Sequence, residues 1–300
     1  MKTLLIVNPA ARHGRGRKCY DRISPRLNEK IPGLEVRMSE YSGHAVEIGR
    51  QAAQEEYDRI LCLGGDGTSF EVINGLYSEG RPPRLPEIGL IPAGTGNSFI
   101  RDFGTVTEEQ AIDNILSGRR RQVDLVEIHY QAGDKTVRRY SLNIVGIGLI
   151  ADILRLTNQR LKFLGAAGYS LAVLIRLAKG MKNRIDISTK ENSRTVMNSA
   201  LVLSNSKYTG GNMMIAPNAD VSNGRVDLVL FNQVNRRDII SIFSRVFSGT
   251  HLKHPKVLSL QSETISVIGD PPLLLMADGE LLGHTPLQLK VHPKELTILT

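Results

Sequence analysis

The stretch that decides the fold is Leu61-Cys62-Leu63-Gly64-Gly65-Asp66-Gly67-Thr68, an apolar run that ends directly in a glycine-rich turn. Other short runs rich in Leu, Ile and Val lie on either side, separated by polar segments with helical spacing such as Val46 to Gln54. Strands that alternate with helices predict a parallel sheet covered by helices, and ligands bind such sheets at the carboxyl ends of the strands. The predicted strands of this region are Thr3–Val7, Leu34–Met38, Arg59–Leu63 and Ile88–Ile91.

Beyond Val123 the alternation stops and strand-like runs follow one another directly. Runs joined by Gly, Asn and Pro turns predict an antiparallel β-sandwich or barrel, here with one helical insertion around Asp152–Lys179. We therefore predict an α/β nucleotide-binding domain over residues 1–125 and a β-sandwich domain over residues 126–300, whose last segment is a candidate to return to the first domain. The predicted strands are Asp124–Tyr130, Val137–Val145, Arg184–Ser188, Ser199–Ser204, Arg225–Asn232, Lys256–Ser262, Glu263–Ile268 and Leu287–Val291.

The composition limits the class of protein. The 300 residues are 41% hydrophobic and 23% charged, as in ordinary soluble globular chains. A net charge of +8 favours phosphate-bearing partners without choosing among nucleotide, nucleic acid and anionic membrane. Two cysteines exclude a disulfide framework and a four-cysteine zinc site, and they indicate a reducing cytosol. The longest apolar stretch, Leu164 to Ile175, is too short to span a bilayer, so we expect a cytoplasmic protein that is peripheral to the membrane.

Three loops, each after a predicted strand, carry residues suited to binding phosphate. The first holds Asn8 and the basic run Arg12–Lys18, and such a turn offers backbone N–H groups and a helix N-terminus to an anion. A solvated loop is the alternative. In the second loop, Gly64 to Thr68, the glycines let the backbone approach a ligand, whereas Asp66 would repel phosphate unless a cation lies between. That combination favours a Mg²⁺-nucleotide over a simple tight turn.

The third loop, Pro92 to Ser98, offers the side chains of Thr95 and Asn97 and turns sharply at Gly94. An N-capping role for Asn97 is compatible with ligand binding. Competing nucleotide motifs fail. The pattern GxxxxGK[ST] is absent, and Gly146 to Ala151, which fits G-x-G-x-x-A, has no acidic residue about 20 positions later to bind a ribose.

Four ordered motifs together resemble one family. They are Asn8-Pro9, GGDGT at 64–68 continuing into Glu71 and Asn74-Gly75-Leu76, PAGTGNSF at 92–99, and Asp278-Gly279-Glu280. From residue 3 to about 300 the chain resembles the diacylglycerol kinase catalytic-domain family, which includes bacterial lipid kinases, sphingosine kinases and ceramide kinase. The resemblance implies an α/β domain with a parallel sheet, like those of NAD kinase and diacylglycerol kinase, followed by an antiparallel β-sandwich, with ATP and lipid meeting in the cleft between them.

The resemblance also implies a set of nucleotide-binding residues. Many relatives carry Thr at the position of Ser39, which keeps the hydroxyl, and bacterial members commonly carry Asp at the position of Ser98. The expected nucleotide-binding residues are Asn8, Ser39, Gly64, Gly65, Asp66, Gly67, Thr68, Gly94, Thr95 and Asn97.

Phosphoryl transfer to an alcohol needs a carboxylate to receive the hydroxyl proton and a metal to neutralise the transferred group. Asp278 and Glu280, separated by one glycine, can serve these tasks, although Asp-Gly-Glu is also a good hairpin turn. In bacterial relatives the base is assigned to this stretch, and in sphingosine kinases the GGDG aspartate is favoured. Glu280 is our first choice for the base and Asp66 for the Mg²⁺ network, with Asp278 and Asp66 kept as alternative bases.

Further residues match family positions for metal and substrate. Bacterial relatives hold a structural Mg²⁺ with a segment ending Asp-Asp-Gly and an aspartate like Asp124; here Asp220, Asn223 and the Arg225 carbonyl would form a site of lower negative charge. Asp152 matches the aspartate that contacts the polar head of the long-chain base in sphingosine kinases. The segment Arg160–Arg184 is interpreted as a core helix, or alternatively as a helix at the membrane surface.

The leading hypothesis is an ATP- and Mg²⁺-dependent kinase that phosphorylates the hydroxyl of diacylglycerol, a related glycerolipid or a sphingoid base at a membrane surface. NAD kinase, whose family shares GGDGT, would phosphorylate a soluble dinucleotide instead. A nucleic-acid-binding module is suggested by the charge and by Arg119 to Arg121, but no recognition motif accompanies them, so we expect no nucleic acid partner. A lipid sensor without turnover and a homodimer are both left open.

Overall fold

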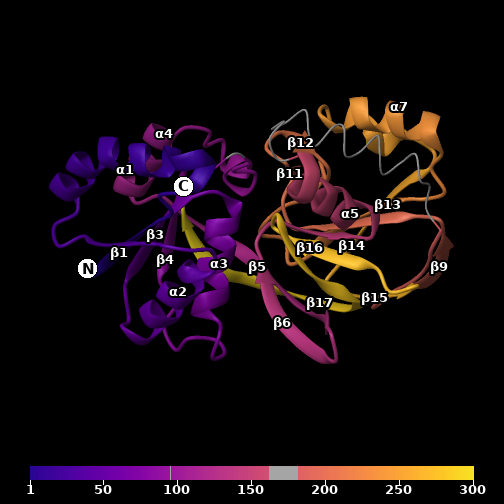
Figure 1. Ribbon diagram of the computed structural model, residues 1–300, viewed down its shortest axis with the longest axis horizontal. Helices are drawn as coiled ribbons and strands as arrows, with labels where there is room; N and C mark the ends of the chain where they lie inside the picture. Colours follow the sequence, from indigo (N-terminus) through magenta and orange to yellow (C-terminus); the bar gives the residue numbers. More distant parts are fainter. Residues whose placement is uncertain (95, 162–181) are drawn as a thin grey trace. The chain divides into compact units, whose positions relative to one another are not determined.

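The computed structural model describes residues 1–94, 96–161 and 182–300, which form two compact units. The first unit comprises Met1–Leu125 together with Pro293–Thr300, and the second comprises Val126–His292. The chain passes from one unit to the other twice, once within strand β5 (Arg120–Ala132) and once within strand β17 (Glu280–Leu299), as Figure 1 shows. The last segment of the chain thus belongs to the first unit.

The first unit is built on a parallel sheet. Its strands are β1 (Thr3–Val7), β2 (Glu35–Met38), β3 (Arg59–Gly64) and β4 (Glu87–Pro92), joined by the end of β17. The order is β17-β4-β3-β1-β2, and every neighbouring pair is parallel. The four strands predicted for this region are confirmed to within one residue at each end, because each is a short apolar run bounded by a turn.

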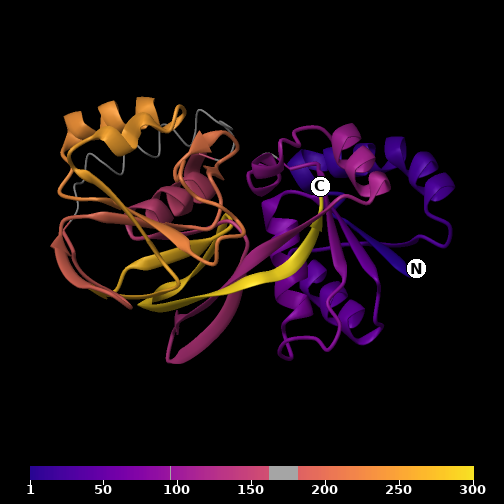
Figure 2. The same cartoon turned by 180° about the vertical axis from the view of Figure 1, so that it is seen from behind.

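Helices cover both faces of this sheet. They are α1 (Ala11–Lys30), α2 (His44–Gln54), α3 (Asp66–Leu76), the 3₁₀ helix η1 (Phe99–Phe103) and α4 (Glu108–Ser117). In Figures 1 and 2 α1 and α4 lie on one face and α2 and α3 on the other. Ile23 of α1 and Ile115 of α4 share a core with Leu61 of β3 and Leu299 of β17. The segment after residue 292 therefore contributes to the core of the first unit.

Two glycines let α2 and α3 cross closely. A Cβ atom added to Gly75 would lie 2.2 Å from the carbonyl oxygen of Val46, and one added to Gly49 would lie 2.6 Å from that of Val72. Real Cβ atoms do not approach backbone oxygens so closely, so any larger residue would separate the helices. Gly75 of the Asn74-Gly75-Leu76 motif is thus required for the close packing of α3 on α2.

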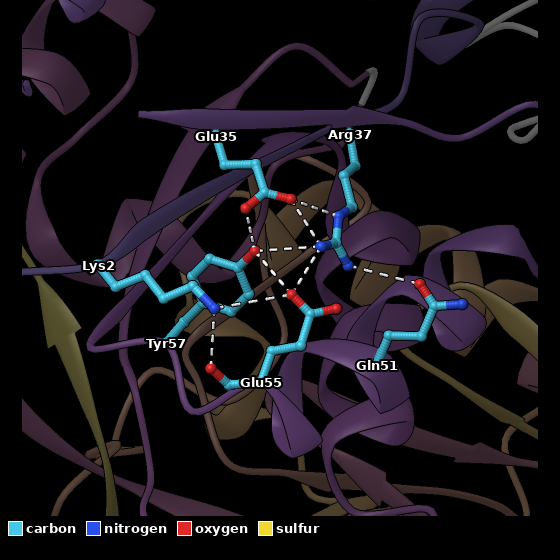
Figure 3. A network of polar contacts seen from close by, with 6 residues as sticks. All are labelled: Lys2, Glu35, Arg37, Gln51, Glu55 and Tyr57. Carbon is cyan, nitrogen blue, oxygen red and sulfur yellow. Dashed lines mark hydrogen bonds and ion pairs between the residues drawn. The ribbon is translucent and has the colours of Figure 1, made fainter. Parts of the chain in front are cut away.

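A polar network joins the amino ends of β1, β2 and β3 (Figure 3). The Tyr57 hydroxyl donates hydrogen bonds to Glu35 and, at 3.0 Å, to Glu55, while the Arg37 guanidinium contacts the same two carboxylates at 2.6 and 2.7 Å. The Lys2 ammonium lies 4.1 Å from the centre of the Tyr57 ring. The network therefore ties these strands together at the edge of the sheet opposite to the three glycine-rich loops.

The second unit is an antiparallel β structure. Strands β13, β10, β7, β16 and β17 are neighbours in that order, with β14 beyond β13, while β15, β8, β9, β5 and β6 extend from β17. Their bounds, with β5 and β17 given above, are β6 (Lys135–Ser141), β7 (Ile144–Ile147), β8 (Arg184–Thr189), β9 (Ser193–Met197), β10 (Ala200–Ser204), β13 (Val226–Phe231), β14 (Val257–Ser262), β15 (Thr264–Asp270) and β16 (Leu274–Ala277). A separate pair, β11 (Tyr208–Thr209) and β12 (Met213–Met214), stands apart from this sheet. The predicted fold class, an α/β domain followed by an antiparallel β-sandwich, is confirmed.

Two helices pack on one face of this sheet. The helical elements are α5 (Leu149–Leu156), the π-helical turn η2 (Thr157–Leu161), α7 (Arg236–Val246) and the 3₁₀ helix η4 (Thr250–Lys253). Ile153 of α5 and Ile242 of α7 enter a common core with Val202 and Val229 of the sheet. Within the described residues, no helix is both long enough and apolar enough to cross a membrane.

Several local predictions for the second unit differ from the structure. The stretch predicted as one strand, Val137–Val145, is two strands, because backbone N–H groups between them donate to the Asp278 side chain instead of to a neighbouring strand. The predicted strand Leu287–Val291 is the middle of the 20-residue β17, whose alternating pattern is interrupted by prolines. Helix α7 and strand β16 were not predicted. Of the predicted helical insertion, α5 and η2 are described, and the residues from 162 to 181 lie outside the described residues.

The network at Tyr57 should make stability depend on pH. Hydrogen bonds from Tyr57 and from Arg37 lower the pKa of the Glu35 and Glu55 carboxyls respectively. Lowered pKa values stabilise the fold above the unfolded value of about 4.3, and this stabilisation is lost as the pH falls through the folded values. We expect Tyr57→Phe to reduce the free energy of unfolding by about 1–2 kcal/mol at pH 7 and by less near pH 3.

Urea unfolding followed by circular dichroism at both pH values measures this difference. The control is Tyr41→Phe, which removes a similar phenol–carboxylate hydrogen bond, to Glu47, at an exposed site where such pairs contribute little. An equal loss of stability at both pH values in Tyr57→Phe would contradict the prediction.

Candidate active site

The three glycine-rich loops lie at the carboxyl ends of neighbouring strands and are joined by backbone hydrogen bonds. The N–H group of Asn8, after β1, donates to the Leu63 carbonyl at 2.9 Å. The N–H groups of Ala93 and Gly94, after β4, donate to the Gly64 carbonyl at 2.7 and 3.0 Å. Ser39, which follows β2 and is buried, donates its N–H to the Val7 carbonyl at 2.8 Å. The sheet thus brings the predicted nucleotide-binding residues of the described chain to one edge.

Glycines allow the second and third loops to touch through bare backbone. A Cβ atom on Gly94 would lie 2.4 Å from the Gly65 Cα atom, and one on Gly64 would lie 2.2 Å from the Thr68 hydroxyl. Both distances are well inside van der Waals contact, so no other residue fits at either position without moving a loop. Gly94 therefore serves the packing of the third loop on the second, and Gly64 leaves room for the Thr68 side chain within the second loop.

Asp66 holds the third loop by its carboxylate. The Ser98 N–H donates to both carboxylate oxygens, at 3.0 and 2.8 Å, and the Phe99 N–H donates to one of them at 3.3 Å. Asp66 thus accepts hydrogen bonds from the first N–H groups of η1. Burial raises the pKa of the Asp66 carboxyl, although these N–H groups act in the opposite direction. The hydrogen bonds from Ser98 and Phe99 explain why an aspartate stands between the glycines of the second loop, and they do so without a bound cation.

Two asparagines fix the same loops. The Asn8 side chain donates to the Thr68 hydroxyl at 3.1 Å, which links the first loop to the second. Asn97, at φ +45°, accepts from the Gly94 N–H at 3.1 Å and donates to the Gly94 carbonyl at 2.9 Å. Thr95, the remaining predicted residue of the third loop, lies outside the described residues. Asn97 therefore stabilises the turn of its own loop through Gly94, a local structural role comparable to the N-capping role considered from the sequence.

A cation that the sequence analysis did not name stands near Asp66. Arg101 of η1 contributes electrostatically to lowering the pKa of Asp66, and its buried Nε atom has no hydrogen-bond partner among the described residues. A buried N–H donor without an acceptor costs free energy, so an anion such as phosphate would satisfy it. The signal in the sequence was a single arginine three residues after Ser98, in the short segment Phe99–Phe103 that also contains Asp102.

The first loop contains unusual backbone. Arg12, His13 and Gly14 have φ angles of +47°, +58° and +86°, so three successive residues are left-handed before α1 continues. Such conformations cost about 1–3 kcal/mol for each residue other than glycine, and they often occur at ligand sites. Gly16 packs on the loop itself, since a Cβ atom there would lie 2.0 Å from the Asn8 carbonyl oxygen. Arg12, Arg15 and Lys18 are exposed around this turn.

Asp278 in the second unit is engaged by four donors. Its buried carboxylate accepts hydrogen bonds from the Ser141 hydroxyl at 2.7 Å and from the N–H groups of Leu142, Asn143 and Ile144 at 2.9, 3.0 and 3.0 Å. Asp278 and Gly279 have φ angles of +49° and +91°, which make the tight turn between β16 and β17. The hairpin interpretation of this motif is thus confirmed for its backbone, and the Asp278 side chain joins this turn to the segment between β6 and β7.

Glu280, the first residue of β17, is exposed on the other side of Gly279. An exposed carboxylate next to a fixed turn can reach a ligand, whereas the buried Asp278 carboxylate is directed into its own unit. Of the two acids in this motif, the geometry favours Glu280 for proton transfer.

The remaining candidate residues each have a partner within their own unit. Asp124 is buried and accepts from the Lys294 N–H at 2.7 Å. Asp220 accepts from the Ser222 N–H and hydroxyl at 3.0 and 2.7 Å, and Asn223 accepts from the Arg225 N–H at 2.9 Å. Asp152 of α5 pairs with Arg155 at 2.9 Å. Most of the segment Arg160–Arg184, including Tyr169, lies outside the described residues.

The donor set limits how Mg²⁺ could be held. Within the described residues, no three His, Cys, Asp or Glu side chains come together as a metal site. Mg²⁺ is commonly bound by one or two carboxylates, with waters and substrate phosphates completing its shell. The residues present therefore fit a Mg²⁺ ion that arrives with a nucleotide better than a resident ion in an all-protein site.

Comparison with known proteins agrees with this architecture. Residues 2–128 match the model of the diacylglycerol kinase catalytic domain, and residues 143–300 match that of the YegS C-terminal NAD kinase beta sandwich-like domain. A chain that carries both domains, with the loops described above at the strand ends of the first, is a phosphotransferase of the lipid-kinase class. It belongs to the diacylglycerol kinase catalytic-domain family.

Relatives cover nearly the whole chain. A diacylglycerol kinase of Staphylococcus carnosus is 28% identical, with 96% of this chain and 92% of that protein aligned. One of Bacillus subtilis is 27% identical, over 94% and 90% of the two chains, and sphingosine kinase 1 of Arabidopsis thaliana is 25% identical, over 98% and 71%.

Solved structures show the same fold. A diacylglycerol kinase from Bacillus anthracis superposes with a TM-score of 0.74 at 22% identity over 99% of this chain and 96% of that chain. Yeast NADH kinase complexed with NADH gives 0.54 at 12% identity, over 99% and 82%. The predicted family and fold are thereby confirmed.

Asp278 should matter for stability more than any exposed acid. Asparagine tolerates its positive φ, so Asp278→Asn tests the carboxylate alone. The variant places an amide among four donors and should lower the free energy of unfolding by about 2–4 kcal/mol, measured by urea unfolding. The same substitution at Asp134, in the exposed turn between β5 and β6, should change it by less than about 0.5 kcal/mol. Equal stabilities for the two variants would contradict the assigned role.

Proposed function

We propose that this protein transfers the γ-phosphate of ATP to the hydroxyl of diacylglycerol or a related lipid. Membership of a kinase family implies use of ATP. The observation that carries the proposal is the locked group of three loops at the strand ends, in the domain that matches the catalytic-domain model. The names of the relatives, diacylglycerol kinase and sphingosine kinase, support a lipid acceptor.

The proposed phosphate site uses backbone and one cation. Helix α3 begins at Asp66 with Gly65 as its N-cap, and no side chain of the described residues caps it. Such a terminus presents N–H groups and the positive end of the helix dipole to an anion. Arg101, with its unpartnered Nε atom, would pair with a phosphate oxygen, and Asn8 and Thr68 would line the same edge.

The proposed acid–base chemistry assigns different tasks to three carboxylates. Glu280 would receive the proton of the acceptor hydroxyl as the new phosphate ester bond forms and the bond between the γ-phosphorus and the β-phosphate oxygen breaks, which releases ADP. Asp278 would hold the turn that positions Glu280, through the four donors described above. Asp66 would keep the second and third loops together and, with Mg²⁺ bound to the nucleotide, would contribute a metal ligand. Mg²⁺ itself would neutralise charge on the transferred phosphate.

The acceptor lipid would be recognised through its polar head group. Asp152 remains a candidate for the polar head group, because a carboxylate accepts hydrogen bonds from hydroxyls and pairs with amines. Its pairing with Arg155 would offer a glycerolipid both an acceptor and a donor. Phosphorylation of a soluble dinucleotide is the second candidate, supported by the fold of the NADH kinase neighbour alone.

Labelled ATP, offered with diacylglycerol, sphingosine, ceramide and NAD in separate reactions, tests the proposal. We expect Mg²⁺-dependent phosphorylation of diacylglycerol, identified by chromatography of the product. Glu280→Gln should reduce kcat by about 10²-fold or more, because a positioned base contributes that much. Glu191→Gln, an exposed glutamate in the turn between β8 and β9, is the matched control and should leave kcat unchanged.

The controls separate chemistry from folding. Asp66→Asn should reduce kcat strongly while the variant keeps a cooperative unfolding transition, since amide oxygens still accept one of the N–H bonds. Phosphorylation of NAD in preference to every lipid would overturn the proposed acceptor. Full activity of Glu280→Gln would remove Glu280 as the base.

A further inference from the structure

Helix α7 presents an unusual outer face. Ile240 and Phe247, just after the helix, are 63% and 45% exposed, although both are large apolar side chains. Arg237, Ser244 and Arg245 are exposed beside them. The five residues Arg237, Ile240, Ser244, Arg245 and Phe247 are called the α7 face below. In Figures 1 and 2 α7 lies at the outer surface of its own unit.

The core of the second unit does not need these exposed apolar residues. Ile242 and Val246, on the inner side of the helix, are buried against the sheet. The helix is fixed at its start by Asn235, whose side chain accepts from the N–H groups of Arg237 and Asp238 at 2.9 and 3.0 Å. Phe243 packs edge-on against Phe247, with 5.6 Å between ring centres. The face is therefore a rigid, preformed surface.

The charge of the α7 face is positive. The only acid in the helix sequence is Asp238, and its carboxylate is paired with the Lys256 ammonium at 2.6 Å and returns a hydrogen bond to the Asn235 N–H at 2.8 Å. Hydrogen bonding with Lys256 keeps the pKa of Asp238 low, so the pair is neutral overall. Among the helix residues whose exposure is described, Arg237 and Arg245 are exposed charges, and Lys253 of η4 is exposed close by in the sequence.

Apolar side chains flanked by cations are suited to the surface of an anionic bilayer. The apolar side chains enter the boundary between head groups and acyl chains, while arginines meet lipid phosphates. A second copy of the chain fits less well, because a two-fold contact would bring the arginines of one face toward those of the other. The surface is small, so binding through it is expected to be reversible and sensitive to salt.

We propose that the α7 face docks this protein on a membrane that contains anionic phospholipid. The inference rests on the proposed function for its purpose, since a kinase for diacylglycerol must meet its acceptor in a bilayer. The docking itself requires neither ATP nor an acceptor lipid.

Sedimentation of the full chain with vesicles tests the inference, in the absence of ATP and of diacylglycerol. Wild type should bind vesicles of phosphatidylcholine with phosphatidylglycerol and should bind weakly to phosphatidylcholine alone. Ile240→Ser with Phe247→Ser, and separately Arg237→Gln with Arg245→Gln, should each weaken the partition coefficient about tenfold or more. Val106→Ser with Ile268→Ser, which removes two exposed apolar residues elsewhere, is the matched control and should bind like wild type.

The other possible results of this experiment also support or overturn the proposed membrane docking through the α7 face. Unchanged vesicle binding in both α7 variants would overturn the inference even if diacylglycerol in detergent micelles is phosphorylated. Loss of binding in both variants would support it even if no lipid is phosphorylated. A dimer of wild type that becomes a monomer in the α7 variants, with unchanged vesicle binding, would assign the face to a second copy and also overturn it. Circular dichroism of each variant verifies that the chain is folded.

Discussion

Close backbone contact between Gly65 and Gly94 is the constraint on which the candidate site depends. A single added methyl group at Gly94 would meet the Gly65 main chain at 2.4 Å, whereas one at Gly65 would lie 3.1 Å from Gly94, so the loops after β3 and β4 can lie together in this way only when position 94 lacks a side chain. The Asp66 carboxylate then reaches the first N–H groups of η1. Arg101, one turn later in η1, is carried to the vicinity of Asp66 by the same contact. The packing of the two loops, the hydrogen bonds that Asp66 accepts from the start of η1 and the position of Arg101 thus all depend on the close contact between Gly65 and Gly94.

The second unit uses the same device, a buried aspartate that gathers backbone N–H groups. Asp66 stabilises the start of a 3₁₀ helix, and Asp278 stabilises the break between β6 and β7. In each case the acid stands next to a glycine and belongs to the motifs that define the family. An acidic residue in such a motif can therefore have a structural role, and of the two acids in the Asp278-Gly279-Glu280 turn, Asp278 is buried and Glu280 is exposed.

The sequence predicted the first unit more accurately than the second for a physical reason. In a parallel sheet both faces are covered, so β1, β3 and β4 are largely apolar runs. β3 ends at Gly64, β4 ends at Pro92 and β1 ends just before Asn8-Pro9, so their bounds are easily read. In the sandwich, β17 alternates and contains prolines, and the strand from Val137 onward is broken by a side chain more than 130 residues away, at Asp278. Long-range hydrogen bonds of this kind leave no local pattern.

The sequence predicted which residues belong to the candidate site, but it did not predict which residues they contact. Loop motifs identified Asn8, Asp66 and Asn97, whereas the partners of Asp66 depend on how β3 and β4 are paired. Arg101 was missed because one arginine carries no pattern in the sequence; its buried Nε atom has no hydrogen-bond partner in the part of the chain that the structure describes.

The course of β17 has a consequence for biosynthesis. Leu296, Ile298 and Leu299 fill the core of the first unit, and Ile298 pairs with Ile88 of β4. During translation β4 is synthesised about 200 residues before the end of β17. Until then the backbone groups along this edge of β4 have no strand to pair with, and the parallel sheet of the first unit is incomplete. The first unit should accordingly reach its final state only after the second unit has been synthesised, and a fragment cut at the first crossing would carry an open sheet edge.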